Sequence, residues 1–451
     1  MNGCKVAIVG GGILGLELAA RLSADGCAVT VFEGASQSGG LAAPAPIGTY
    51  TWDRFYHVIL GSDSYLQAFL NDLGLSHQLR WGTTRTGFYV DGRLYSMSST
   101  LEFLRFPPLS LVDKARLAAT IWHASGIKNW KPLESLLATE WLRTWSGQRT
   151  VDRIWLPLLR AKLGDNYRRA SAAFIGAIIT RMYAARRSGM KREVFGYVEG
   201  GYATVLRACE DRLRRLGVEL RAGRAVTGIR SRPDGVTLDF AGGPSEEVDR
   251  VVLTIPCSRI ADLCPQLTAA EQTRLRRVTY QGIICASFLC RQPLAGYYVT
   301  NITDSWVPFT AVIETTSLVD RATFGGNNLV YLPRYVTQDD PFWNKSDAEI
   351  QREFLAALQR MYPRFSSTDV IAFQIARVRE MLAVSTLGYS DEVLPPVRTS
   401  LDNVFIVNSA QIAHGTLNVN ETLALAVTKS AELSPYLRPA LPRVSAAGVA
   451  C

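Results

Sequence analysis

Three glycines near the start of the chain have a spacing that suits phosphate binding. Gly10, Gly12 and Gly15 follow the apolar run KVAIV and open the amphipathic stretch ILGLELAARL. In such a G-x-G-x-x-G turn, the first glycine allows a tight turn, the second admits a pyrophosphate to the backbone, and the third lets helix and strand pack closely. The helix N-terminus directs free N–H groups toward the phosphates. This stretch therefore predicts a dinucleotide site.

An acidic residue stands where a dinucleotide site needs one. A second strand, AVTVFE, ends at Glu33, roughly 20 residues beyond the glycines, where a carboxylate can accept both ribose hydroxyls of an adenosine. The carboxylate would repel a 2′-phosphate, so a plain ribose is expected. The alternative is a helix start followed by an exposed glutamate, but the order strand, glycines, helix, strand, acid favours the binding site.

The segments that follow resemble those of FAD-dependent oxidoreductases, the group that includes protoporphyrinogen oxidases, flavin amine oxidases and phytoene-type desaturases. The resemblance rests on the glycine pair in GASQSGGLA, on VFGYVEGGYATVL and VDRVVLTIP in the middle of the chain, and on DNVFIVNSAQIAHGTLNVNETLALAV near its end. It implies FAD rather than a nicotinamide, because nicotinamide dehydrogenases generally lack the second glycine pair. The residues that it assigns to FAD are Gly10, Gly12, Ile13, Leu14, Gly15, Glu33, Gly39, Gly40, Leu41, Val226, Asn408, Ser409, His414 and Leu417.

The closing motif departs from the family pattern. Many relatives have glycine and aspartate where this chain has Asn408 and Ser409, so we expect neutral hydrogen bonds to the cofactor. Apart from His414, no histidine or cysteine stands at the usual covalent flavin positions, and the resemblance therefore implies non-covalent FAD. The NSAQI variant is similar to that of flavoproteins grouped with polysaccharide-building enzymes, which implies a glycan or a lipid-linked precursor as substrate.

These motifs predict an α/β fold, with a Rossmann-like FAD-binding domain of the GR2 type and an interleaved substrate domain of mixed sheet and helices. The FAD-binding domain would comprise residues 1–56, 195–262 and 396–435. The substrate domain would comprise residues 57–194 and 263–395, and 436–451 would form a tail.

Within the predicted substrate domain, FYVDGRLYSM is typical of a hairpin turning at Asp91 and Gly92. The stretch from SLVDKARLAATIWHA to RMYAARR is mainly helical in pattern, whereas QGIICASFLC, FTAVIETTS and NNLVYLPRYV are strand-like. We expect the strands to form a sheet over the flavin, with substrate entering between sheet and helices.

Five side chains are candidates for the reacting site, and each has a structural alternative. His57 could act as a base or bind substrate, or it could be a packed histidine. Arg85 could hold an anionic group by a bidentate fork, or it could be a surface arginine. Lys162 resembles a pocket-lining position but also fits a solvated helix face, while Arg334 and Tyr335 could face the flavin from the sheet, with Tyr335 equally suited to the core.

We therefore expect an oxidoreductase that removes a hydride from a C–H bond by C–N, C–O or C–C oxidation and passes the electrons to oxygen or another acceptor. One alternative resembles UDP-galactopyranose mutase, in which reduced flavin attacks a sugar carbon without net oxidation. The other is a non-catalytic scaffold stabilised by flavin. Catalytic residues are harder to assign than FAD-binding residues, because the cofactor carries most of the chemistry.

The composition narrows the possible partners. The formal charge of +9 suits an anionic partner, and the basic run RMYAARRSGMKR fits either a solvated helix end or a surface resting on acidic lipids. Interleaved aromatic residues and a nucleic-acid motif are missing, so we expect no nucleic-acid partner. The eight scattered cysteines indicate neither a metal site nor disulfides. With no secretory leader and no apolar run of spanning length, we expect a cytoplasmic protein, with peripheral membrane contact possible.

Tryptophans are concentrated in the first third of the chain. Large aromatic side chains at helical spacing usually face inward, so core packing is the favoured interpretation, with a sugar- or polyprene-binding surface as the alternative. The residues concerned are Trp52, Trp81, Trp122, Trp130, Trp141, Trp145 and Trp155.

Overall fold

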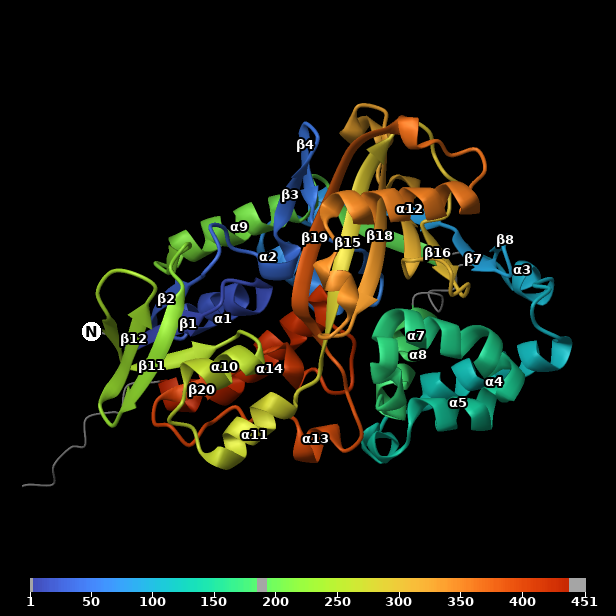
Figure 1. The fold of residues 1–451 in the computed structure, drawn as a ribbon. Coiled ribbons are helices and arrows are strands. Elements are labelled where there is room, and N and C mark those ends of the chain that lie inside the picture. The colour runs from blue at the N-terminus through green and yellow to red at the C-terminus, as the bar shows by residue number, and fades with distance from the viewer. Residues whose placement is uncertain (1–2, 185–192, 438–451) are drawn as a thin grey trace, which may run out of the picture.

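A parallel five-stranded sheet forms the centre of one side of the molecule in the computed structural model, which describes residues 3–184 and 193–437 (Figure 1). The strand order is β10-β2-β1-β14-β20, and every neighbouring pair is parallel. This sheet confirms the predicted Rossmann-like α/β class. Its strands are β1 (Lys5–Val9), β2 (Ala28–Phe32), β10 (Glu219–Arg221), β14 (Arg250–Leu253) and β20 (Val404–Ile406).

The sheet is covered on both faces, as its apolar strands require. Three helices that are distant in sequence pack on one face and share a core with α2 (Ser64–Asp72). The other face packs against the β11-β12-β13 sheet and against α10 (Cys257–Leu263) and α11 (Ala269–Arg277). The three helices of the first face are α1 (Ile13–Ala24), α9 (Gly201–Arg215) and α14 (Val419–Leu437), and the small sheet consists of β11 (Val226–Arg232), β12 (Gly235–Phe240) and β13 (Glu246–Val248).

A mixed seven-stranded sheet stands beside this domain in the order β19-β15-β18-β17-β16-β7-β8. Its outer face packs against α12 (Asp347–Met361), and its inner face covers the chain that leaves the glycine turns through β3 (Pro44–Ile47) and β4 (Tyr50–Asp53). The strands expected from the sequence are confirmed, although β19 is longer than any of them. The seven strands are β7 (Thr86–Val90), β8 (Arg93–Ser96), β15 (Tyr280–Cys290), β16 (Val299–Ile302), β17 (Ala311–Glu314), β18 (Asn328–Val336) and β19 (Val370–Ala383).

The predicted hairpin is confirmed. β7 and β8 pair antiparallel across a two-residue loop, with φ of 51° at Asp91 and 74° at Gly92. Both values lie in the left-handed region that a tight hairpin turn requires, and Asp-Gly is a favoured sequence there.

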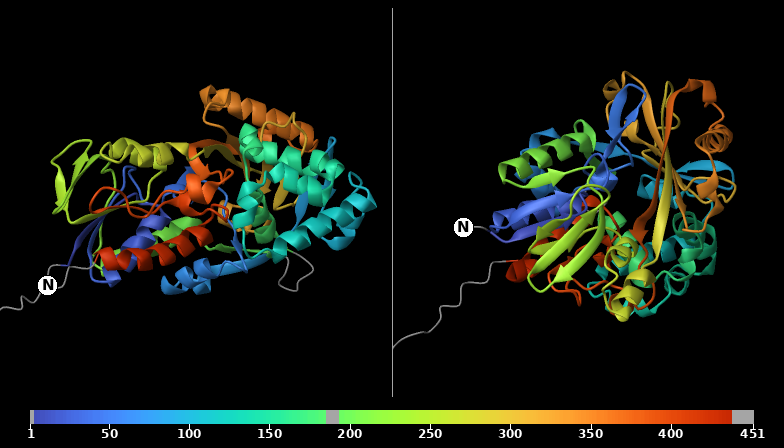
Figure 2. Two further views of the ribbon diagram at one scale, coloured as in Figure 1. Left: turned by 90° about the horizontal axis from the view of Figure 1, so that it is seen from below. Right: turned by 60° about the vertical axis from the view of Figure 1, so that its left-hand side comes forward.

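The predicted helical stretch forms a layer beneath the mixed sheet, at the end of the molecule farthest from the parallel sheet (Figures 1 and 2). Its members are α4 (Leu111–Gly126), α5 (Ala138–Ser146), α7 (Leu156–Leu163) and α8 (Ala172–Ala184), and the short helix α3 (Thr100–Leu104) precedes them beside β8. A small sheet of β5 (Ile59–Leu60), β9 (Glu193–Val198) and β6 (Leu79–Thr84) connects this layer to the parallel-sheet domain.

Among residues 3–184 and 193–437, no helix is both long enough and apolar enough to cross a bilayer. In the same part of the chain, His, Cys, Asp and Glu side chains do not gather in a group of three that could hold a metal ion.

Candidate active site

The glycine turn after β1 has the geometry of a phosphate cradle. Gly12 and Gly40 approach so closely that a Cβ added to Gly40 would lie 3.1 Å from the Cα of Gly12. The backbone N–H of Gly39 donates to the carbonyl of Gly11 at 2.7 Å. The two glycine-rich turns therefore lie side by side at the N-terminus of α1, where free N–H groups and the helix dipole favour an anion.

Gly15 has a structural role instead. A Cβ at Gly15 would lie 2.0 Å from the carbonyl oxygen of Gly10, so only glycine lets α1 pack against the turn. The neighbouring side chains of Ile13 and Leu14 are buried in the core beneath α1. Any contact that these two residues make with a phosphate must therefore come from the backbone.

Glu33 lies at the carboxyl end of β2, beside the glycine turn. Its carboxylate accepts hydrogen bonds from the N–H groups of Gly11 and Ala35, both at 2.7 Å. Each carboxylate oxygen retains a further acceptor position. Glu33 is thus held in place by the turn that would bind the phosphates and is free to accept ribose hydroxyls.

The segment that leads into β11 runs beside Glu33. The N–H of Arg224 donates to the carbonyl of Glu33 at 2.8 Å, and Val226 follows two residues later. The Val226 side chain is buried in the core on that face of the sheet, so its predicted adenine contact would use the backbone.

The side chain of Asn408 is fully used within the protein. Its Oδ1 accepts from the N–H of Ala410 at 3.1 Å, and its Nδ2 donates to the carbonyl of Ile255 at 2.9 Å. Asn408 therefore caps the turn after β20 and ties it to β14, which leaves the backbone there to contact a cofactor. Contacts of Ser409, which is half-buried, stay a prediction.

The closing loop reaches across to the helical layer. His414 Nε2 is hydrogen-bonded to Glu134, a nearly buried carboxylate that also accepts the N–H of Ser390 at 3.0 Å. Burial raises the pKa of Glu134, but the hydrogen bonds from Ser390 and His414 outweigh it, so the pKa lies below its ordinary value. Leu417 packs against the core of the helical layer, while Leu41 packs beneath the mixed sheet.

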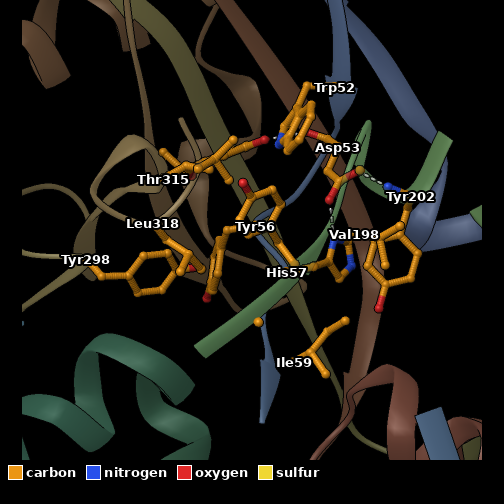
Figure 3. A pocket seen from close by; sticks show the side chains of 15 residues that line it. Trp52, Asp53, Tyr56, His57, Ile59, Val198, Tyr202, Tyr298, Thr315 and Leu318 are labelled. Carbon is orange, nitrogen blue, oxygen red and sulfur yellow. Dashed lines mark hydrogen bonds and ion pairs between the residues drawn. The ribbon is translucent and has the colours of Figure 1, made fainter. Parts of the chain in front are cut away.

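A cavity lies between the inner face of the mixed sheet and the chain around β4 (Figure 3). His57 points into it and lies between Asp53 and the ring of Tyr202, with ring centroids 4.6 Å apart. The Nδ1 of His57 lies 3.6 Å from Asp53 Oδ2, too far for a hydrogen bond, and is buried without another partner. The Oγ1 of Thr315, which lines the same cavity, is likewise buried and unpartnered.

Asp53 is positioned by the start of α9. Its Oδ1 accepts the N–H of Tyr202 at 2.7 Å, and a Cβ at Gly201 would lie at the same distance from that oxygen. A carboxylate is favourable at this helix N-terminus. Burial, followed by the nearby Asp53 charge, raises the pKa of Tyr202, so the phenol keeps its proton.

The side chains of Tyr56, Tyr335 and Lys162 lie in a row on the inner side of the sheet. The hydroxyls of Tyr56 and Tyr335 are 2.8 Å apart, and Lys162 Nζ lies 5.0 Å from the centre of the Tyr335 ring. Burial and the neighbouring Tyr335 raise the pKa of Tyr56. The structure thus brings His57, Tyr335 and Lys162 to the inner side of the sheet; their catalytic roles stay predictions.

Two predicted site residues lie elsewhere. Successive strand residues point to opposite faces, so Arg334 lies on the outer face of β18, where it covers the Phe342 ring and donates to the carbonyl of Pro308 at 2.8 Å. The prediction that it faces the flavin is wrong. Arg85 is exposed and lies against the ring of Tyr297, so the surface alternative applies to it.

The sequence interpretation missed the tyrosines that surround His57. Tyr56, Tyr197, Tyr202, Tyr298 and Tyr331 line the cavity, yet they come from distant segments of the chain. No spacing in the sequence connects them. The adjacency of Tyr56 to His57 was the one available signal.

A second cavity, of about 210 Å³, lies between the closing loop and α8. Asp63 and Arg181 form a bidentate ion pair in its wall, at 2.7 and 3.1 Å, with Asp63 almost fully buried. The sequence suggested that Arg181 belongs either to a solvated helix end or to a surface that rests on acidic lipids. Its ion pair with the buried Asp63 favours neither interpretation. The other basic residues of that run, 186, 187, 191 and 192, lie outside the described residues.

The model of the flavin containing amine oxidoreductases matches residues 15–418. The chain belongs to this family. This assignment confirms the resemblance seen in the sequence, and it makes the protein an enzyme of the flavin-dependent oxidoreductase type.

Three relatives compared with this chain are distantly similar to it. A hydroxysqualene dehydroxylase from Sinorhizobium fredii is 25% identical over 293 residues, which cover 60% of this chain and 66% of that protein. A protein from Exiguobacterium sp. 255-15 assigned as a protoporphyrinogen oxidase has a TM-score of 0.76 at 19% identity, with 97% of this chain and 100% of that chain covered. For reduced UDP-galactopyranose mutase the TM-score is 0.71 at 14% identity, with 96% of both chains covered. The two structural matches show a shared fold.

Proposed function

We propose that this flavoenzyme uses non-covalently bound FAD to remove a hydride from a C–H bond of an organic substrate held beneath the mixed sheet. The close approach of the Gly12 and Gly40 backbones beside the fixed carboxylate of Glu33 carries the proposal. A side chain on Gly40 would fill the space that a pyrophosphate needs. The residues present therefore fit an adenine dinucleotide.

Glu33 would hold the ribose, and the N–H groups at the start of α1 would hold the pyrophosphate. When bound, FAD supplies the acceptor for a hydride from a carbon placed against its ring. The protein's own contribution is to position the substrate and exclude water. Electrons would then pass to oxygen or another acceptor.

The cavity around His57 has a volume of about 20 Å³, so in this structure it has room for one small polar group of a substrate. Its wall is mainly aromatic and aliphatic, whereas Oγ1 of Thr315 is buried without a hydrogen-bond partner, and Nδ1 of His57 is buried with Asp53 Oδ2 at 3.6 Å, beyond hydrogen-bond distance. Because an unpaired buried polar group costs about 1–3 kcal/mol, a hydroxyl or amine of the substrate would be stabilised there. His57 would also accept the proton released on oxidation, with Asp53 orienting the ring.

An apolar or lipid-linked substrate suits this wall better than a free sugar. The similarity to a hydroxysqualene dehydroxylase supports the same class. A lipid-linked glycan precursor, which the closing motif led us to expect, has both an apolar body and polar hydroxyl groups. We include it among the candidate substrates.

The test is anaerobic mixing of the purified flavoprotein with candidate substrates while flavin absorbance is followed. Bleaching by an alcohol or amine on an apolar skeleton supports the proposal. Turnover that occurs only after reduction with dithionite would instead support a mutase, for which the fold shared with UDP-galactopyranose mutase is the structural argument. A folded protein that neither carries nor takes up FAD would overturn the proposal.

A further inference from the structure

The outward face of α4 is apolar. Surface helices usually present charged and polar residues to solvent, but Leu111, Ala115, Ala118 and Trp122 recur at helical spacing on the exposed side of α4. Leu111 is 73% exposed and Trp122 is 74% exposed. The core packing expected from the sequence is wrong for Trp122, and also for Trp81, which is 42% exposed. Core packing holds for Trp52 and Trp141, each 5% exposed.

The neighbouring helix α3 extends this face. Leu101 and Leu104 are 55% and 50% exposed. Lys114 on α4 donates a hydrogen bond to the carbonyl of Leu104 at 2.7 Å, so the end of α3 is tied to α4. We call Leu101, Leu104, Leu111, Val112 and Trp122 the α3–α4 surface.

The exposed charge on the segment that carries the α3–α4 surface has one sign. Within residues 100–128 the exposed charged side chains are all basic, namely Arg105, Arg116 and Lys128. The two acids of this stretch, Glu102 and Asp113, serve as capping residues at the starts of α3 and α4. An apolar face with a basic rim is complementary to a surface that is apolar inside and anionic outside.

We propose that the α3–α4 surface docks on the headgroup region of an anionic lipid bilayer. Leucines would enter the acyl boundary, Trp122 would lie at the interface that tryptophan favours, and the basic rim would contact lipid phosphates. A second copy of the chain is the competing occupant, but a two-fold interface would bring identical basic rims together. Docking is independent of the proposed reaction, because it involves neither the glycine turns nor His57.

Vesicle flotation of the full-length flavoprotein tests this inference. Wild type is expected to float with phosphatidylglycerol-containing vesicles and to bind about tenfold less to pure phosphatidylcholine. L111Q/W122Q is expected to weaken binding to the anionic vesicles by about tenfold or more. R105E/K128E should remove the preference for anionic lipid.

The matched control is L216Q/I371Q, which replaces two exposed apolar residues on other elements, 36% and 43% exposed. It should float as wild type does, and all variants should keep wild-type melting temperatures. The inference is overturned if wild type fails to float with either vesicle, or if L111Q/W122Q floats equally well. A wild-type dimer that L111Q/W122Q converts to monomer, together with absent flotation, would assign the surface to a second copy.

Discussion

His414 on the closing loop of the parallel-sheet domain is hydrogen-bonded through its imidazole to the Glu134 carboxylate of the helical layer, 280 residues away in the chain. Glu134 also accepts hydrogen bonds from Ser390, and Lys131 Nζ lies 3.6 Å from it. A nearly buried carboxylate thus joins three segments at the boundary of the expected cofactor and substrate regions. Its ionisation should therefore contribute to stability.

Glu134→Gln is expected to lower the free energy of unfolding by about 1–3 kcal/mol at neutral pH, because a charged acceptor is lost. The pKa of Glu134 lies below its ordinary value of 4.5. The stabilisation is therefore fully present above that value and is lost as the pH falls through the folded-state pKa. Urea unfolding of both proteins between neutral and acidic pH should show the gap closing on acidification. Glu140→Gln, at an exposed position of α5, is the control; a gap independent of pH would contradict this assignment.

Gly12→Ala should weaken FAD binding without loss of stability, whereas Gly15→Ala should lower the stability of the fold. The nearest atom to a Cβ at Gly12 is the Cα of Gly40, at 3.9 Å, whereas a Cβ at Gly15 would lie 2.0 Å from the carbonyl of Gly10. The first variant should keep the wild-type melting temperature and bind FAD about tenfold or more weakly. The second should lose roughly 1–3 kcal/mol of stability. Thermal melting and FAD titration check both; full FAD affinity in Gly12→Ala would exclude a cradle at this turn.

Glu33→Lys should abolish the yellow colour of the purified protein, since a cation replaces the acceptor of the ribose hydroxyls. Glu33→Gln separates binding from folding, because it keeps an acceptor for the N–H of Gly11, which Glu33 binds at 2.7 Å. It should retain partial FAD occupancy. Flavin absorbance of folded protein, verified by circular dichroism, is the measurement, and full occupancy in Glu33→Lys would refute the ribose contact.

His57→Gln should slow flavin reduction by a bleaching substrate about 10²–10⁴-fold if His57 takes the substrate proton. FAD affinity should not change, because His57 lies in the cavity beneath the mixed sheet rather than at the glycine turns. Stopped-flow reduction across pH provides the readout. A wild-type rate and pH profile would show that His57 only packs against Tyr202.

Tyr335→Phe should destabilise the protein by about 1–2 kcal/mol by leaving the buried hydroxyl of Tyr56, 2.8 Å away, without this partner. The aromatic ring under Lys162 is retained, so that contact should survive. Thermal unfolding measures the loss, with Tyr436→Phe, at a partly exposed position of α14, as the control. Equal losses in both variants would argue against the hydroxyl pair.

Local patterns were sufficient for the glycine turn, the Asp91–Gly92 hairpin and the strand β18, because each depends on conformations and periodicities within a few residues. The same local patterns were insufficient to predict on which face of the sheet Arg334 and Tyr335 each lie. The two are adjacent in β18, and the pleat puts one on each face. Which face meets the cofactor domain depends on how the sheet packs, and a single strand does not encode that.

The sequence by itself determined the parallel-sheet fold, the glycine turn with its neighbouring acid, and the flavoenzyme family, since these depend on short contiguous motifs. Only the tertiary structure decided that His57 meets Tyr202 beside Asp53, that His414 pairs with Glu134, and that Trp122 faces solvent. The physical reason is that such contacts join residues from different elements. Burial and pairing across elements follow from the packing of the whole chain, in which each side chain competes for limited interior space.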